Sequence, residues 1–544
     1  MLYNKLLLIR KDIKYMTFKN LLDSAQYENK DMVVAAKVGN QIHELADEYN
    51  NETNVQWLDL TTTEGREIYK KSLIFLMTKA FYDIYPDKKL NVRFSLGHGV
   101  YVDLENEETV SDDMLTALWT QMFTLIQRDI PFNKVSVKTN DAIELCNKFG
   151  MPEKALLFAY RRTSSVNLYE LDGYYNYLFS DLAYSTGVLT VFNLVKYQSG
   201  FLLLFPDKDM PNSAAECPDA PKLCTTLRES ANWTDMMQIN SIGELNQAIV
   251  SGKMDDIVLI QEAFMDNKIA AIAENIINNK NSIVLIAGPS SSGKTSFSNR
   301  LSVHLRKYGY NAHPIACDDY FKNRKDIPFG PDGLQDLEAL SVVDLDLLEH
   351  DMEKLQSGEE INLPHFNFAS GEREYHGNML KLGNKDIIVM EGIHCLNPQF
   401  LPNANAYRVY ISALTTLNMD NHNRISSSDL RLLRRMARDA RHRNINPTET
   451  IQRWQSVRAG EEKNIFPYQE LADVVFNSSF VYEIPMMKNA VEALLFSVDR
   501  DSDEWLVAKK LLKFLDFTLG CSDKAVPNNS ILREFLGGSC FNVG

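Results

Sequence analysis

The sequence predicts an α/β chain in which a parallel sheet flanked by helices follows smaller α+β units. Between about 283 and 480, short and continuously apolar runs alternate with helical segments, which is typical of a parallel sheet covered on both faces. The first 205 residues instead mix strand-like alternation with helical periodicity. At 544 residues the chain is too long for one ordinary core, so several domains are expected.

The composition and the charge of the chain argue against several classes of protein. The net charge of −15 disfavours general binding to nucleic-acid backbones, because like charges repel. No run approaches the roughly 20 apolar residues that span a bilayer, and the apolar stretch Leu6–Ile9 is too short for a signal peptide. The seven cysteines are scattered without C-x-x-C spacing, which argues against a disulfide framework or a zinc site. We therefore expect a cytoplasmic protein without a membrane partner.

The N-terminal elements come first along the chain. Val33–Val38 and Val55–Leu60 read as strands on either side of a short helix at Ile42–Tyr49. Residues 66–82 have helical periodicity, and the apolar runs flanking the turn at Gly97-His98-Gly99 predict a hairpin.

The Pro-, Asp- and Ser-containing stretch 206–232 indicates a linker or exposed loop, with two helices expected at 243–280. After the α/β region, 503–517 reads as a helix and the tail is expected to pack on the preceding domain. The predicted organisation is a small α+β unit at 1–60, an α+β domain at 61–205, a linker with connecting helices at 206–280, an α/β domain at 281–500, and a C-terminal helix and tail at 501–544.

The α/β region contains a phosphate-binding loop. Expected strands are Ile283–Ala287, Pro314–Cys317, Ile387–Met390, Val409–Ile411 and Val474–Phe476, and expected helices are 294–307, 341–357 and 429–442. The segment between the first strand and the first helix matches G-x-x-x-x-G-K-[ST] completely. Its glycines let backbone N–H groups face phosphate oxygens at the helix start. The expected ATP-binding residues are Gly288, Pro289, Ser290, Ser291, Ser292, Gly293, Lys294, Thr295 and Ser296.

Carboxylates follow two other strands. Asp318 comes directly after the second strand, where it can accept the proton of an attacking hydroxyl or hold Mg²⁺ through water. Glu391 closes the strand Ile387–Met390, so Thr295 and Glu391 are the expected Mg²⁺ ligands. The neighbour Gly392 replaces the second carboxylate that water-activating ATPases commonly place there.

The helix at 429–442 carries four arginines on one face. Arg431, Arg434, Arg435 and Arg438 fall within a stripe about 60° wide at 100° per residue. Four like charges at this spacing repel each other unless an anion lies among them. The stripe predicts a lid that closes over transferring phosphates, with Lys294, Arg434, Arg435 and Arg438 stabilising the developing charge.

These segments together resemble the uridine kinase branch of the uridine kinase/phosphoribulokinase family. The resemblance rests on GPSSSGKT at 288–295, CDDYFKNR at 317–324, LPHFNFASGEREY at 363–375, MEGIHCL at 390–396 and RLLRRMARDARHRN at 431–444. It implies phosphoryl transfer from ATP to the 5′-hydroxyl of a nucleoside, with Asp318 as the catalytic aspartate. In the family's uridine-binding pattern P-x-Y-D-F-x-x-H-x-R, this chain has Phe366 for the tyrosine and Gly371 for the histidine, so the acceptor stays open. Candidates for the substrate pocket are Asp318, Tyr320, Phe366, Arg373 and Asp336, with Asp332 as an alternative to Asp336.

The N-terminal half resembles other proteins. Residues 31–60 are similar to a TGS domain, and 61–205 to the second N-terminal domain of threonyl-tRNA synthetase, notably at 80–104. The histidine and cysteine set that edits mischarged tRNA in synthetases is absent here, so no deacylase activity is expected and His98 is interpreted as structural. The lead hypothesis is thus an ATP:nucleoside kinase. The rivals are a kinase of the same fold acting on another metabolite and a nucleotide-gated RNA-binding protein, and self-association stays open.

Overall fold

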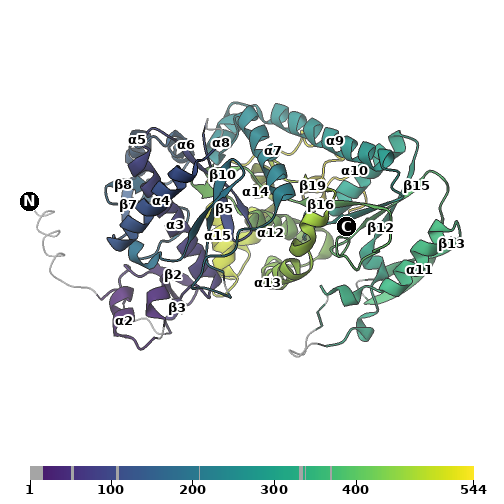
Figure 1. The fold of residues 1–544 in the computed structure, drawn as a ribbon, viewed down its shortest axis with the longest axis horizontal. Helices are drawn as coiled ribbons and strands as arrows, with labels where there is room; N and C mark the ends of the chain where they lie inside the picture. Colours follow the sequence, from purple (N-terminus) through teal and green to yellow (C-terminus); the bar gives the residue numbers. More distant parts are fainter. Residues whose placement is uncertain are drawn as a thin grey trace, which may run out of the picture.

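The N-terminal sheets lie at one end of the molecule and the parallel sheet lies toward the other (Figure 1). This is seen in a computed structural model that describes residues 16–27, 29–50, 54–105, 109–207, 209–329, 335–336, 338–367 and 370–543. None of the helices in these ranges is long and apolar enough to cross a bilayer.

The first unit is a three-stranded antiparallel sheet beside a short helix. Its elements are α2 (Phe18–Ser24), β1 (Ala35–Val38), β2 (Gln41–Glu44) and β3 (Gln56–Leu58), in the strand order β2-β1-β3. The predicted helix at Ile42–Tyr49 is wrong. Gly39 has φ +53°, and the tight turn that it allows places Gln41 opposite Val38, so the chain returns as a strand.

The next part contains two further antiparallel sheets, with the strand orders β4-β5-β10-β9 and β6-β7-β8. The hairpin predicted around Gly97 is confirmed, because β4 and β5 pair from Leu96 and Gly99 outward. The elements are α3 (Thr63–Ile84), β4 (Leu90–Leu96), β5 (Gly99–Leu104), α4 (Asp112–Gln127), β6 (Asn133–Lys138), α5 (Thr139–Lys148), α6 (Pro152–Ala159), β7 (Ser165–Leu171), β8 (Tyr174–Asn176), β9 (Asn193–Tyr197) and β10 (Gly200–Leu204).

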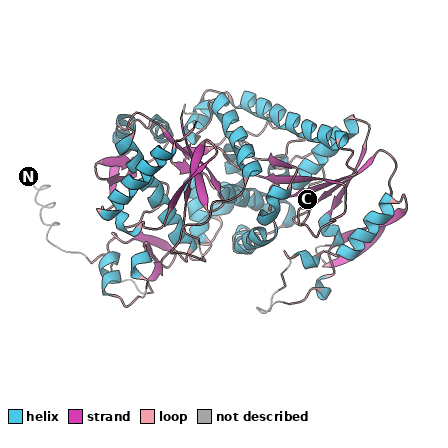
Figure 2. Ribbon diagram, viewed as in Figure 1, coloured by secondary structure: helices cyan, strands magenta, loops and turns pink. Residues whose placement is uncertain are grey.

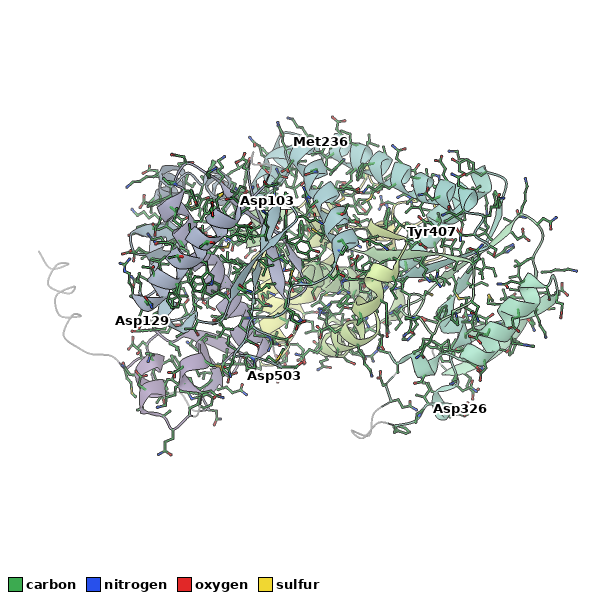
Figure 3. All side chains as sticks on the ribbon, in the orientation of Figure 1. Asp103, Asp129, Met236, Asp326, Tyr407 and Asp503 are labelled. Atoms are coloured by element: carbon green, nitrogen blue, oxygen red, sulfur yellow. The ribbon has the colours of Figure 1, made fainter. Side chains whose placement is uncertain are left out.

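Three helices connect the halves, namely α7 (Pro221–Met237), α8 (Ile242–Val250) and α9 (Met254–Asn278). The expected linker at 206–232 is therefore wrong beyond residue 220. Pro221 occupies the first turn of α7, and Leu223, Cys224 and Leu227 are buried on its inner face. Side chains fill the space between the elements, whereas Met236 at the end of α7 lies at the surface (Figure 3).

The second half contains a five-stranded parallel sheet in the order β12-β15-β11-β16-β19, and helices cover it (Figure 2). Its strands are β11 (Ile283–Ala287), β12 (Asn311–Ala316), β15 (Asp386–Glu391), β16 (Ala406–Ser412) and β19 (Val474–Asn477). Val284 and Ile286 pack into one core while Ile283 and Leu285 pack into another, so the predicted two-sided covering is confirmed.

The helices of this half are α10 (Lys294–Lys307), α11 (Leu345–Gln356), α12 (Ser427–Arg438), α13 (Pro447–Asn464), α14 (Glu483–Phe496), α15 (Trp505–Leu515) and α16 (Arg533–Leu536). Two hairpins extend from it, β13 (Glu360–Asn367) with β14 (Glu372–Lys381), and β17 (Asn418–Asp420) with β18 (Asn423–Arg424). The first hairpin and α11 lie at the far end of the molecule from α2 (Figure 1).

The two halves are joined by a buried ion pair. Lys154 of α6 donates to Asp420 of β17, and both side chains are fully buried. The backbone N–H groups of His422 and Asn423 also donate to Asp420. A charge in such a place is tolerated only with its partner and hydrogen bonds present, so this contact fixes how the halves meet.

We expect the change Asp420→Asn to lower the free energy of unfolding by about 3–5 kcal/mol, because it leaves the Lys154 ammonium buried without a counter-charge. Urea unfolding followed by circular dichroism measures the effect. The matched control is Asp172→Asn, which breaks the exposed pair with Arg128 and should leave the midpoint unchanged. Equal midpoints for both variants would contradict the structural role of Asp420.

Candidate active site

The loop from Gly288 to Lys294 joins β11 to α10, and its backbone geometry depends on particular residues. Gly293 has φ +85° and Ser291 has φ +61°, both in the left-handed region. A Cβ atom on Gly288 would lie 2.0 Å from the carbonyl oxygen of Ile411. Glycine at 288 and 293 therefore lets the loop wrap closely at the start of α10, as a phosphate-binding loop requires.

The predicted metal ligands lie together at the carboxyl edge of the sheet. The Thr295 hydroxyl donates to Glu391 Oε1 at 2.6 Å. Burial raises the pKa of Glu391, against the opposing effects of Lys294 and of the Thr295 hydrogen bond. Lys294 Nζ donates to the carbonyl oxygens of Gly288 and Pro289 at 3.0 and 3.4 Å, so the ammonium rests on its own loop.

Two neighbouring aspartates at the end of β12 have different surroundings. Asp319 Oδ1 accepts hydrogen bonds from His365 Nδ1 and from the backbone N–H of Phe366, each at 3.1 Å, and so holds the hairpin β13–β14. Asp318 is half-buried, and burial raises its pKa to about 7, with the Glu391 carboxylate adding to the rise and Lys294 opposing it. A carboxylate with this pKa, beside the loop lysine, is suited to accept a proton near neutral pH.

Three of the four arginines of α12 contact the loop, namely Arg431, Arg434 and Arg435, but two of the four are committed to buried ion pairs. Arg434 is fully buried and makes two 2.7 Å hydrogen bonds to Glu483, and Arg431 pairs likewise with Glu461 at 2.5 and 2.8 Å. Both also reach carbonyl oxygens of the loop, at Ser290 and Ser291. Arg434 is thus held in a buried ion pair while its catalytic role stays a prediction, and α12 packs as a core helix rather than as an open lid.

The remaining two arginines are incompletely bonded. Arg435 Nη1 donates to the Ser290 hydroxyl at 2.8 Å, and Arg438 lies 3.7 Å from Glu534. Asp439, placed off the stripe by its spacing, lies 3.3 Å from Arg435 and 3.9 Å from Arg438. Burial lowers the pKa of Arg438 to about 10 and also lowers that of Arg435. Each of these two cations therefore already has a carboxylate nearby, although neither pair is as closely bonded as those of Arg431 and Arg434.

Arg434→Met and Arg435→Ala should separate stability from activity. The first leaves Glu483 buried without a partner, so we expect the free energy of unfolding to fall by about 3–5 kcal/mol. The second should lower kcat by about 100-fold through loss of charge stabilisation, with little change in the urea midpoint. Each variant is the control for the other. If Arg435→Ala lowers the urea midpoint as much as Arg434→Met does and still retains full activity, the catalytic role of Arg435 is wrong.

Several buried polar atoms around the loop have no hydrogen-bond partner. Within the described residues these include Ser291 Oγ, Ser292 Oγ, Arg435 Nε and Arg438 Nε. Cationic and hydroxyl groups left unbonded around a glycine loop fit a bound polyphosphate. No group of three His, Cys, Asp or Glu side chains suited to a metal occurs in the described part of the chain. Thr295 and Glu391 fit a Mg²⁺ ion that takes its other ligands from phosphate and water.

The substrate candidates divide into two groups. Tyr320 is fully buried and its hydroxyl donates to Asp351 at 3.2 Å, so the side chain packs in the core and its substrate role stays a prediction. Phe366 is also buried, packed edge-on against Phe321. Arg373 donates to Asp344 at 2.9 Å while its buried Nη1 has no partner.

Asp336 is exposed and accepts from Lys463 Nζ at 3.2 Å, and Asp332 lies outside the described residues. Sequence reasoning missed Glu461, Glu483 and Glu534. The signal for them would have been isolated acidic residues within apolar surroundings, which is weak without a structure.

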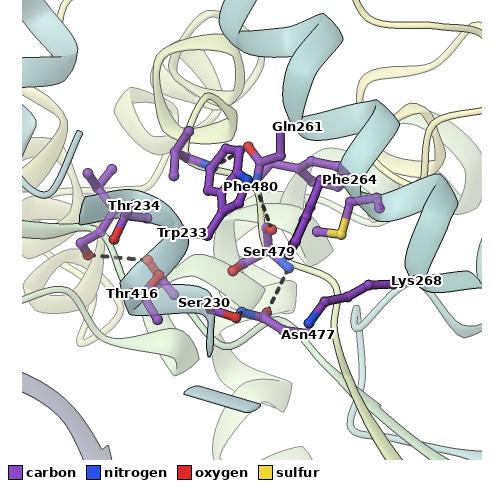
Figure 4. A pocket seen from close by; sticks show the side chains of 14 residues that line it. Ser230, Trp233, Thr234, Gln261, Phe264, Lys268, Thr416, Asn477, Ser479 and Phe480 are labelled. Atoms are coloured by element: carbon purple, nitrogen blue, oxygen red, sulfur yellow. Dashed lines mark hydrogen bonds between the residues drawn. The ribbon is translucent and has the colours of Figure 1, made fainter. Parts of the chain in front are cut away.

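A small cavity lies behind the loop that follows β19 (Figure 4). Trp233 and Phe264 stack beside it with ring centroids 5.5 Å apart, and Gln261 bonds to the backbone of Ser479 and Val481. Its volume is about 20 Å³, which is room for roughly one or two waters. The cavity adjoins the loop that carries Ser478, whose hydroxyl donates to Ser292 O at 2.5 Å.

In the N-terminal half, His98 is exposed at the β4–β5 turn and lies 3.5 Å from Asp207. The synthetase-like resemblance of this half remains an expectation.

Comparisons with known proteins find similar proteins for the second half of the chain. Residues 283–484 match the family model described as "Phosphoribulokinase / Uridine kinase family". The uridine kinases of Staphylococcus aureus strains JH9 and Newman are each 27% identical to this chain over 216 residues, covering 39% of this chain and 96% of theirs. A solved structure from Bacillus stearothermophilus, described as a possible uridine kinase, is 19% identical, with a TM-score of 0.28 over 39% of this chain and 98% of that one.

Proposed function

Residues 283–484 form a uridine kinase-like P-loop kinase domain of the phosphoribulokinase/uridine kinase family, and from this premise we propose that the protein is a cytoplasmic, ATP-dependent kinase of a small hydroxyl compound. The acceptor proposed first is the 5′-hydroxyl of a nucleoside. The proposal is supported chiefly by the half-buried Asp318, which lies at the carboxyl edge of the sheet with the phosphate loop and Glu391.

The proposed reaction follows from these positions. The loop amides between Gly288 and Thr295 bind the phosphates of ATP, and Lys294 turns from its carbonyl partners toward them. Asp318 orients the acceptor hydroxyl and takes its proton as the acceptor oxygen bonds to the γ-phosphorus. The bond from that phosphorus to the β–γ bridging oxygen breaks, and ADP leaves with the electron pair. Arg435 and Arg438 offset the negative charge that spreads over the phosphoryl oxygens.

A Mg²⁺ ion, when bound, would supply positive charge that offsets the negative charge of the transferring phosphates. Thr295 and Glu391 would hold it, because their oxygens already lie within hydrogen-bond distance of each other at the edge where the phosphates bind.

The test is product analysis by mass spectrometry. The full chain is incubated with MgATP and a panel of ribonucleosides and deoxyribonucleosides, and ADP release is measured in parallel. We expect one nucleoside to gain a single phosphoryl group on its 5′-hydroxyl. ADP release that is no faster with any panel member than without one would sink the nucleoside assignment.

A second candidate is a metabolite that carries an anionic group. Its support is Arg373, whose buried Nη1 has no partner and which lies on β14 at the end of the predicted acceptor segment. The family's tyrosine and histidine handles for a pyrimidine are replaced here by Phe366 and Gly371. A parallel panel of sugar phosphates and hydroxy acids separates the two candidates, because it offers hydroxyl groups together with an anion for Arg373.

A further inference from the structure

The C-terminal tail returns to the start of the phosphate-binding loop helix. The carboxylate of Glu534, on α16, accepts from the Ser296 hydroxyl at 2.9 Å and from the Ser296 backbone N–H at 3.3 Å. Its other oxygen lies 3.7 Å from Arg438 Nη1. Glu534 is only 4% exposed, so in this conformation its carboxylate is held between Ser296 and Arg438.

Ser296 holds a position that matters for a nucleotide. It is the third residue of α10, so its N–H is one of the helix-start donors without an intrahelical partner. Loops of this kind direct such donors to phosphate oxygens. Glu534 thus supplies an internal anion to an amide and to an arginine that would otherwise meet a phosphate.

The residues around Glu534 fill the adjoining space. A Cβ atom built on Gly293 would lie 2.3 Å from Ile531 Cγ2, so Ile531 presses directly on the loop. Phe535 lies under the Arg434 guanidinium, 4.9 Å from its ring centroid. Ile531, Leu532 and Phe535 have no exposed surface and belong to the same core as α12 and α14. A ligand extending from the first turn of α10 in this direction meets the tail.

We propose that the C-terminal tail, residues 519–543, is an autoinhibitory strap that competes with ATP for the start of α10. The proposal rests on the proposed kinase function. When ATP binds, Ser296 and Arg438 exchange the Glu534 carboxylate for phosphate, and the tail leaves the loop. ATP then binds the minor population of molecules in which the strap is released. The apparent affinity for ATP is therefore lower than the affinity of the released form, in proportion to the fraction of molecules that are released.

The first test compares two carboxylate-to-amide variants of the full chain by calorimetric titration with MgATP. Glu534→Gln keeps the side-chain shape and removes the charge that Ser296 and Arg438 bind. Asp516→Asn is the matched control, since Asp516 is exposed in the turn after α15. We expect Glu534→Gln to bind ATP about tenfold more tightly than the wild type, and Asp516→Asn to bind like the wild type. Unchanged or weaker ATP binding by Glu534→Gln overturns the strap.

The second test is hydrogen exchange on the wild-type chain, which does not depend on a variant that folds. Saturating MgATP should speed amide exchange in residues 530–537 while slowing it in the loop. Slower or unchanged exchange in 530–537 with ATP bound contradicts release of the tail. Tighter ATP binding by Glu534→Gln without phosphorylation of any acceptor would remove the kinase assignment and leave the strap standing. Phosphoryl transfer to an acceptor, without tighter ATP binding by Glu534→Gln, would remove the strap and leave the kinase assignment standing.

Discussion

Replacing Asp318 with asparagine should lower kcat/KM for the acceptor by about 10²- to 10⁴-fold, the usual range for loss of a general base. The amide keeps the size of the carboxylate and loses the capacity to accept a proton. The effect should fall mainly on kcat, because the loop and the cations that bind ATP are unchanged. Initial rates of ADP formation with the acceptor found by product analysis measure it.

The pH profile gives the same residue a second signature. The pKa of Asp318 is raised to about 7, so the carboxylate form needed as a base is lost as the pH falls through 7. In the wild type, kcat/KM should fall about tenfold for each pH unit below that value, and Asp318→Asn should lose this acid limb.

The neighbouring carboxylate is the control for Asp318. In Asp319→Asn the amide oxygen can still accept from Phe366 N–H, so activity should stay within a few-fold of the wild type. An Asp318→Asn enzyme that is fully active, or an acid limb that persists in it, would exclude Asp318 as the base.

Replacing Lys294 with alanine should lower kcat/KM by about 10²- to 10³-fold, as expected for loss of a preorganised cation at the transferring phosphoryl group. Unlike Asp318→Asn, this change should also weaken ATP binding. The fold should tolerate it, since Lys294 bonds only to loop carbonyl oxygens of Gly288 and Pro289 within the part of the chain that the structure describes.

Lys307→Ala is the matched control for Lys294. Both lysines lie on α10, one at its first residue and one at its last, so the change in net charge is the same. Titration with MgATP and steady-state rates should show no effect of Lys307→Ala. Full turnover by Lys294→Ala would mean that the loop does not bind the transferring phosphate.

Local patterns predicted the elements that carry the candidate chemistry. The loop from Gly288 to Thr295, the strand before it and the helix at 294–307 could be read directly, because loop, strand and helix each leave a periodic or compositional trace of their own. Glu391 and Asp318 were placed at one edge because the ends of parallel strands meet there.

The short helix predicted at Ile42–Tyr49 is wrong because this segment leaves no clear periodic trace. The strand that forms there, β2, has only four residues, too few to show the period of a strand, and the turn at Gly39 decided that the chain pairs with β1.

Taken alone, the sequence predicted that a phosphate-binding loop, a candidate proton acceptor and a stripe of cations belong to one α/β domain. Only the tertiary structure decided which of these groups are already bonded to other side chains. Arg434 is held by Glu483, 49 positions away, and Ser296 is bonded by Glu534, 238 positions away. Ion pairs and hydrogen bonds between such distant positions leave no periodicity in the chain, because they depend on how the helices and the tail pack rather than on neighbouring residues.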